Sequence, residues 1–132
     1  NNELEFFRHT CWKDVLTYWY SLLKPGGQLY VSVPDFKAVC EEYLSSGDIS
    51  KIIGITIGGQ KNNEDLHGML YDYKLLTSEL SNIGFTNIGR YNWMDFDAFK
   101  QEGYDDFSAA YIPHMDFNNG RLMMLNVKAI KK

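Results

Sequence analysis

The chain has 132 residues, a hydrophobic fraction of 45% and a formal net charge of -4, which indicates one folded domain and excludes a disordered chain. The basic residues are not clustered, so the charge pattern argues against a nucleic-acid partner. No apolar run approaches the roughly 20 residues of a membrane helix, and no signal-peptide pattern is present. We therefore expect no membrane partner and a cytoplasmic location. Cys11 and Cys40 are expected to be reduced, buried thiols.

The first predicted helix covers residues 10–23, because apolar side chains recur there at steps of three and four. Its apolar stripe consists of Trp12, Val15, Leu16, Trp19, Leu22 and Leu23. The segment from Lys24 to Gly27 ends this helix, since Pro25 cannot continue it and glycine accepts positive φ. This turn precedes a strand instead of opening a helix, so it does not match a phosphate-binding loop. Residues 28–33 are predicted to form a short buried strand.

The second predicted helix begins after Asp35, whose carboxylate can cap it by accepting backbone N–H bonds, and it ends near residues 45–47. Its expected buried stripe consists of Phe36, Val39, Cys40, Tyr43 and Leu44. Residues 49–57 are apolar and broken at Gly54, a pattern that leaves helix and strand equally open. A polar loop led by two glycines covers residues 58–65.

The third predicted helix is capped by Asp72 and stopped by Gly84. One of its faces is apolar and carries Tyr73, Leu76, Leu80 and Ile83. Strands are predicted over 85–91 and 122–130. The aromatic-rich stretch between them is long for a loop, which favours a role in function or in covering a sheet edge, and its residues 91–111 could line a pocket.

His67 is the best candidate for acid–base chemistry, because histidine titrates near neutral pH; the alternative is a hydrogen-bonded structural residue. Gly58, Gly59 and Gln60 could let the backbone approach a ligand closely, or could form a flexible loop. The cysteines and histidines show no recognised metal-ligand spacing, so no metal site is expected.

Three stretches, in this order and at these spacings, resemble class I S-adenosylmethionine-dependent methyltransferases of the type 11 group. Leu4-Glu5-Phe6 and the helix ending in Lys24-Pro25-Gly26-Gly27 resemble the segment "LEH … EWYRVLKPGG". Residues 28–35 resemble the fifth strand of that family, with its terminal Val-Pro-Asp. Residues 58–85 resemble the pattern "GGQ … H … FD … L … L … GF".

The resemblance implies an α/β fold, the C-terminal half of a Rossmann-like methyltransferase domain. The implied sheet is mixed and three-stranded, in the order 28–33, 122–130 (antiparallel) and 85–91, with flanking helices. Residues 1–132 would then form one partial domain without the N-terminal cofactor-binding half. The family holds the methionine moiety of the cofactor with a Gly-x-Gly-x-Gly loop and the ribose with an acidic residue, and neither motif is found in this sequence.

The implied function is methyl transfer from S-adenosylmethionine to a small-molecule or sugar-like acceptor. By resemblance, Leu4, Glu5 and Phe6 lie at the cofactor mouth, although Phe6 stands where the family often has histidine. The implied substrate side consists of Val33, Pro34, Asp35, Gly59 and Gln60, with His67 as the acid–base residue. The alternatives are a non-enzymatic binding or assembly module and an inactive fragment.

The resemblance also predicts self-association. Strand 28–33 is internal in the family, so here one of its edges lacks a neighbour, and helix 10–23 loses part of the surface that it covers. Unpaired edges and apolar patches favour contacts with other chains. We therefore expect a homo-oligomer through the edge of strand 28–33 or the face of helix 10–23. The alternative is that the N-terminal residues or the loop 92–120 cover this edge.

Overall fold

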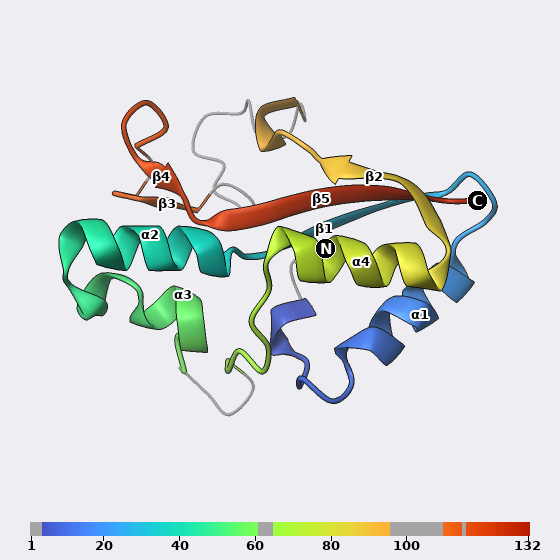
Figure 1. The fold of residues 1–132 in the computed structure, drawn as a ribbon, viewed down its shortest axis with the longest axis horizontal. Helices are drawn as coiled ribbons and strands as arrows, with labels where there is room; N and C mark the ends of the chain where they lie inside the picture. Colours follow the sequence, from blue (N-terminus) through green and yellow to red (C-terminus); the bar gives the residue numbers. More distant parts are fainter. Residues whose placement is uncertain (1–3, 61–64, 96–109, 115) are drawn as a thin grey trace.

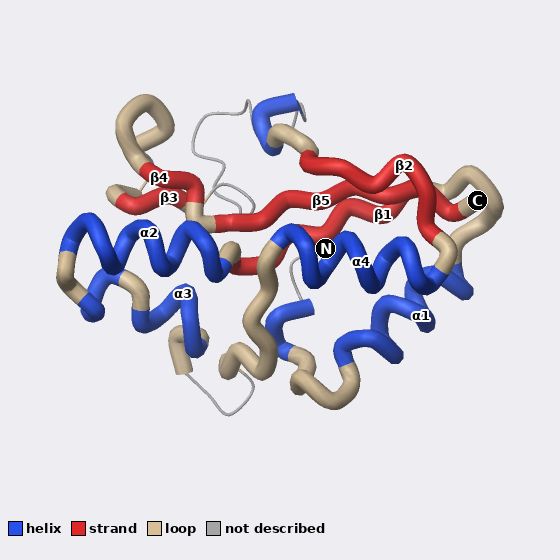
Figure 2. Tube along the Cα trace, in the orientation of Figure 1, coloured by secondary structure: helices blue, strands red, loops and turns tan. Residues whose placement is uncertain are grey.

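The computed structural model describes residues 4–60, 65–95, 110–114 and 116–132. They form a three-stranded sheet, a separate two-stranded pair, and helices that lie mainly along one side of the larger sheet (Figures 1 and 2). The elements in chain order are η1 (Leu4–Phe6), α1 (Trp12–Leu22), β1 (Gln28–Pro34), α2 (Phe36–Ser46), η2 (Ile49–Lys51), α3 (Ile53–Ile57), α4 (Tyr73–Ile83), β2 (Phe85–Arg90), η3 (Trp93–Asp95), β3 (Tyr111–Ile112), β4 (Arg121–Leu122) and β5 (Met124–Lys131).

The larger sheet has the order β1-β5-β2, and β5 runs antiparallel to both of its neighbours. The expectation of a mixed sheet is therefore wrong, because β1 and β2 share a direction but are not paired with each other. The last strand also begins later than predicted. Arg121 and Leu122 pair with β3 instead, and the amide of Met123 donates to the carbonyl of Ala110 at 2.9 Å. The long strand β5 therefore starts at Met124.

The main core lies between the larger sheet and the helices α1 and α4. Its buried members are Leu4, Trp12, Leu16, Val31, Val33, Tyr71, Leu76, Leu80, Phe85, Leu125, Val127 and Ala129. The alternation along β1 and β5 explains this layer, because every second side chain of a strand points to the same face. The predicted stripe of the first helix is only partly buried, since Leu22 near its end is 64% exposed.

Both predicted aspartate caps are confirmed. The Asp35 carboxylate accepts from the amide of Lys37 at 3.2 Å and begins α2, and the Asp72 carboxylate accepts from the amide of Leu75 at 2.8 Å and begins α4. The amide of Phe36 donates to the carbonyl of Tyr71 at 2.9 Å. This bond brings the starts of α2 and α4 together at the end of β1.

The predicted buried stripe of α2 is confirmed only at Val39. The helix buries Ala38, Val39 and Glu42, whereas Leu44 is 85% exposed. Ala38 and Val39 pack with Ile52 and Met123 in a second core cluster, and the side chain of Arg121 on β4 contacts the carboxylates of Glu41 at 2.9 Å and Glu42 at 3.2 Å. The helix therefore presents Ala38, Val39 and Glu42 to its neighbours and leaves Phe36, Cys40, Tyr43 and Leu44 exposed.

The expectation of two buried thiols is also wrong. Cys11 is half-buried and Cys40 is exposed, and both are free. The pattern of residues 49–57 does not distinguish a helix from a strand, and in the structure this segment forms η2 and α3. None of the helices in the described part of the chain combines the length and apolar character that crossing a bilayer requires.

The outer edge of β1 is partly covered within the described residues. Ser32 in its centre is fully buried, and η1 packs against this strand; the bond from Ser32 to Asn126 at 2.6 Å joins β1 to its paired neighbour β5. Gln28, at the start of the strand, is exposed. Much of the loop 92–120 that was expected to carry function or to cover this edge, residues 96–109 and 115, lies outside the described residues. The aromatic pocket expected over 91–111 falls largely there as well.

Candidate functional site

A cavity of about 330 Å³ lies where η1, the end of β1, α3 and the segment before α4 meet. It is lined by Glu5, Phe6, Pro34, Gly54, Ile55, Gly59, Asp65, His67, Ala110 and Met124. Five of the nine residues proposed from the sequence are in this lining: Glu5, Phe6, Pro34, Gly59 and His67. A volume of this size suits a small-molecule ligand.

His67 is fixed by the short helix α3. Its backbone amide donates to the carbonyl of Ile57 at 3.1 Å, and its Nδ1 lies 2.9 Å from the carbonyl oxygen of Ile55. A carbonyl only accepts, so Nδ1 carries the proton and Nε2 has the free electron pair. Burial lowers the pKa of His67, opposed by the hydrogen bonds to the backbone of Ile55 and Thr56 and by the charge of Asp65. The neutral imidazole can therefore accept a proton at Nε2.

The loop that follows α3 is closed by its glycines. The amide of Gln60 donates to the carbonyl of Asp65 at 2.9 Å. Gly58 has a φ of +89°, and a Cβ atom there would lie 2.5 Å from the carbonyl oxygen of Asp65. A Cβ atom on Gly59 would lie 2.7 Å from the Asp65 carboxylate. Glycine at these two positions allows the loop to place Asp65 in the cavity wall.

The N-terminal segment is held against the residues next to His67. The amide of Gly68 donates to the carbonyl of Glu5 at 2.8 Å, and a Cβ atom on Gly68 would lie 2.7 Å from the carbonyl oxygen of Phe7. The Phe6 ring meets the His67 ring edge-on, with centroids 5.3 Å apart. Glu5 is 4% exposed, so its carboxylate forms a buried part of the site.

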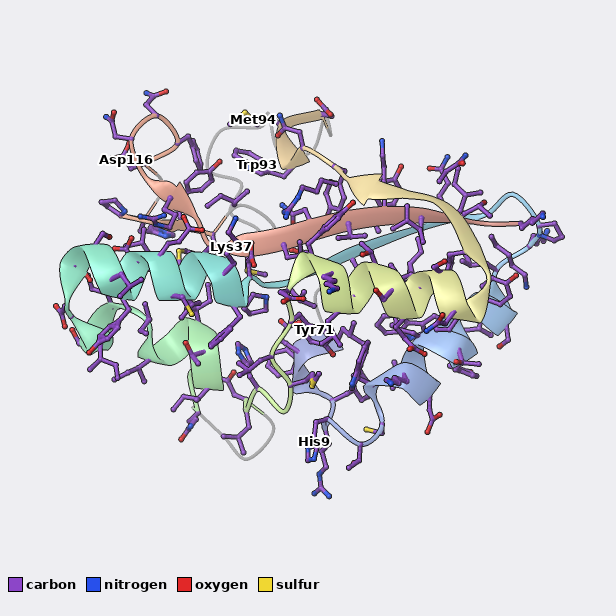
Figure 3. The ribbon with its side chains drawn as sticks, in the orientation of Figure 1. His9, Lys37, Tyr71, Trp93, Met94 and Asp116 are labelled. Atoms are coloured by element: carbon purple, nitrogen blue, oxygen red, sulfur yellow. The ribbon has the colours of Figure 1, made fainter. Side chains whose placement is uncertain are left out.

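Tyr71 connects this segment to the start of α4 (Figure 3). Its hydroxyl donates to the carbonyl of Leu4 at 3.3 Å, and its ring meets that of Trp12 edge-on at 5.3 Å. Burial raises the pKa of the Tyr71 phenol, and the nearby Glu5 raises it further. Tyr71 is therefore a neutral donor at physiological pH and a structural support for the segment that carries Glu5.

Four residues proposed from the sequence do not line the cavity. Leu4 and Val33 are fully buried in the main core, because their positions in η1 and β1 turn them away from the cavity. Asp35 is occupied in capping α2, and burial raises the pKa of its carboxyl against the effect of the Lys37 amide and Arg90. Gln60 is exposed, with a φ of +55°.

The cavity also contains residues that the sequence analysis did not propose. Asp65 enters the wall through the closure of the glycine loop. Met124 lies opposite Pro34 in the β1–β5 register, so the pairing of these strands would have identified it. Gly54 and Ile55 belong to α3, whose helical nature the sequence left open. Ala110 precedes the β3–β4 pair.

A second, more open hollow of about 390 Å³ lies on another side of His67. Its lining includes His9, Thr56 and Leu70. Of the described residues in this lining, His67 is the one that was proposed from the sequence as a site residue. Within the described residues, no three side chains of metal-ligating type come together. The cavity between η1 and α3 is therefore the better candidate site.

Comparisons with protein-family models, with curated proteins and with solved structures gave no match to this chain.

Proposed function

We propose that this chain forms the acceptor-binding half of an S-adenosylmethionine-dependent methyltransferase domain, and that the cavity between η1 and α3 receives a small-molecule methyl acceptor. One observation supports this proposal above all. Glu5, Phe6, Pro34, Gly59 and His67, which are separated along the chain, line one cavity, and the motif resemblance had assigned each of them to the cofactor mouth or the substrate side.

The residues of this chain would position the acceptor and receive its proton. The cofactor, when bound, supplies a methyl group already activated by its sulfonium, so the remaining requirement is mainly alignment. Phe6, Pro34 and Ile55 provide apolar walls that restrict the acceptor and exclude water. Nε2 of His67 takes the proton from the acceptor, since its lowered pKa keeps the ring neutral near pH 7.

The lining fits the cofactor in part. Its carboxylates suit a positive sulfonium, whereas the glycine loop that would hold the methionine moiety is not in this sequence. Residues 1–132 alone are therefore expected to bind S-adenosylmethionine with a dissociation constant weaker than about 1 mM, a binding free energy of less than about 4 kcal/mol. Titration calorimetry measures this, and a low-micromolar constant would contradict the half-domain proposal.

Methyl transfer itself is tested with the protein as its gene encodes it. The assay follows radiolabel from S-adenosylmethionine to low-molecular-weight acceptors in a metabolite extract. Label in small molecules supports the proposed function. Tight cofactor binding without any label transfer would favour a binding module instead.

The second candidate is an assembly module, and the exposed apolar side chains favour it. Tyr18 and Leu22 on α1 are 61% and 64% exposed. We propose that two copies associate through this face of α1 or through the edge of β1 near Gln28. Light scattering at micromolar concentration is expected to give a mass above the 15.3 kDa of one chain. Loss of the larger species in Leu22→Glu would locate the contact on α1, and a monomeric unmodified chain would rule out self-association.

A further inference from the structure

We propose that a polar cavity on the face of the larger sheet opposite α1 and α4 (Figure 2) binds a small carboxylate with a short apolar body. The cavity has a volume of about 240 Å³ and is lined by Gln28, Tyr30, Asn87, Lys128, Ala129 and Ile130. Carboxylate binding here is independent of the proposed function, because the described lining of this cavity shares no residue with that of the cavity between η1 and α3.

The position of the cavity follows from the alternation of side chains along the strands. Val31 and Val127 belong to the main core between the sheet and the helices α1 and α4. Their neighbours Tyr30 and Lys128 therefore point to the opposite face, where they are cross-strand partners in the β1–β5 register. The strand β1 has seven residues, a length of about 20 Å. This length separates the polar cavity from the cavity between η1 and α3, which lies at the other end of the strand.

A bulge in β2 brings a further polar side chain to the polar cavity. The β2–β5 register shifts by one residue between Thr86 and Gly89. Asn87, inside the bulge, has a φ of +52° and lines the cavity. Asparagine adopts this left-handed conformation more readily than most residues, and bulges often direct a side chain toward a binding site. The irregularity of β2 thus places an amide group in the cavity wall.

Gly89 leaves space beside Lys128. The two residues are cross-strand partners, so a side chain at position 89 would lie on the same face of the sheet as the lysine. Apart from its own chain neighbours, a Cβ atom at Gly89 would have no atom of the described residues within 4 Å. The sheet therefore has room for a ligand next to Lys128.

The polar groups of the lining suit an anion. The Tyr30 hydroxyl donates to Oε1 of Gln28 at 2.7 Å, which engages the oxygen of this amide and leaves its NH₂ group as a donor. Lys128 is exposed, and its ammonium has donors alone. Among the described residues, none forms an ion pair with Lys128, and no aspartate or glutamate lines the cavity. One free ammonium beside amide donors matches a carboxylate, whose two oxygens accept several charge-assisted hydrogen bonds.

The apolar groups of the lining suit a short hydrocarbon body. Ile130 contributes an aliphatic side chain, and Tyr30 contributes an aromatic ring. The Tyr30 ring is held in place by the Tyr91 ring, which it meets edge-on with centroids 5.3 Å apart. A single carboxylate on a small apolar group matches both parts of the lining, whereas a phosphate monoester brings nearly two negative charges to one ammonium.

Three probes test the ligand class on the full chain. Butyrate, its neutral isostere butyramide and inorganic phosphate are titrated, and binding is followed by the amide NMR signals of Asn87, Gly89 and the Gln28 side chain. Butyrate is expected to shift these signals saturably and to leave those of His67 unchanged. Butyramide should bind about 10-fold to 100-fold more weakly, because it forms no charge-assisted hydrogen bond. No saturable shift with butyrate, equal binding of butyramide or tighter binding of phosphate would overturn the proposal.

Removal of the cation tests the role of Lys128. Lys128→Met is expected to weaken butyrate binding at least about 10-fold and to change butyramide binding little. Lys74→Met is the matched control, since Lys74 is an exposed lysine on α4 and its loss changes the net charge equally. A loss of butyrate binding that is the same in both variants would reduce the effect to net charge and overturn the site.

Occlusion of the cavity tests its location. Gly89→Val adds a side chain in the space beside Lys128, where a Cβ atom meets no obstacle among the described residues, so the fold should be kept. This variant is expected to lose the binding of butyrate and butyramide alike, which separates it from Lys128→Met. A dispersed amide spectrum identifies the folded protein. Unchanged butyrate binding by folded Gly89→Val would place the ligand elsewhere and overturn the proposal.

Discussion

Replacement of Trp12 by alanine is expected to lower the free energy of unfolding by about 3–5 kcal/mol, the usual cost of removing a large aromatic side chain from a core. Trp12 is 2% exposed and belongs to the main core with Leu16 and Leu76. Its ring also meets the Tyr71 ring edge-on at 5.3 Å. The expected loss is a large part of the roughly 5–15 kcal/mol that stabilises a typical domain.

Tyr18→Ala is the matched control on the same helix. Tyr18 is 61% exposed, so its removal should change the free energy of unfolding by no more than about 0.5 kcal/mol. Both variants are measured by urea unfolding followed by far-ultraviolet circular dichroism, which does not depend on the missing indole. A Trp12→Ala loss similar to that of Tyr18→Ala would show that α1 does not unfold together with the sheet.

The helices were predictable because their signals are local. Asp35 and Asp72 lie immediately before α2 and α4 and accept the first backbone amides, and Gly84 ends α4 with a positive φ. A cap and its helix are within a few residues of each other, so the sequence contains both partners of the interaction.

The buried face of α2 was not predictable in this way. It depends on residues distant in the sequence: Met123 packs with Val39 in a core cluster, and Arg121 contacts Glu42 across 79 positions of the chain. The start of β5 depends in the same way on the pairing of Arg121 with Ile112. The periodicity of a sequence shows which residues are apolar. It does not show which face of a helix will be covered by an element that is distant in the sequence.

The residues of the candidate site also divide into those that local motifs predict and those that depend on long-range contacts. Glu5 and His67 were found through motifs with fixed spacing. Asp65 and Met124 were missed, because one reaches the wall through the closure of a loop and the other through the register of two strands. Both are consequences of tertiary structure.

In the protein as its gene encodes it, replacement of His67 by glutamine is expected to lower the turnover of methyl transfer. The expected loss is about 10²–10⁴-fold, the usual contribution of a positioned general base. Glutamine can still donate a hydrogen bond to the carbonyl of Ile55, so the fold around α3 should be kept. It cannot take a proton from an acceptor. His114→Gln is the matched control, since His114 is exposed and does not line the cavity.

The pH profile separates a base from a merely structural histidine. Burial lowers the pKa of His67 below its ordinary value of 6.5, and a general base acts in its neutral form. The turnover of the unmodified protein should therefore fall on the acidic side with a midpoint below pH 6.5, as the ring takes up a proton. His67→Gln should retain no such acidic limb. Unchanged turnover, or an acidic limb that survives the substitution, would remove His67 from the chemistry and leave it the role of holding α3 against the segment before α4.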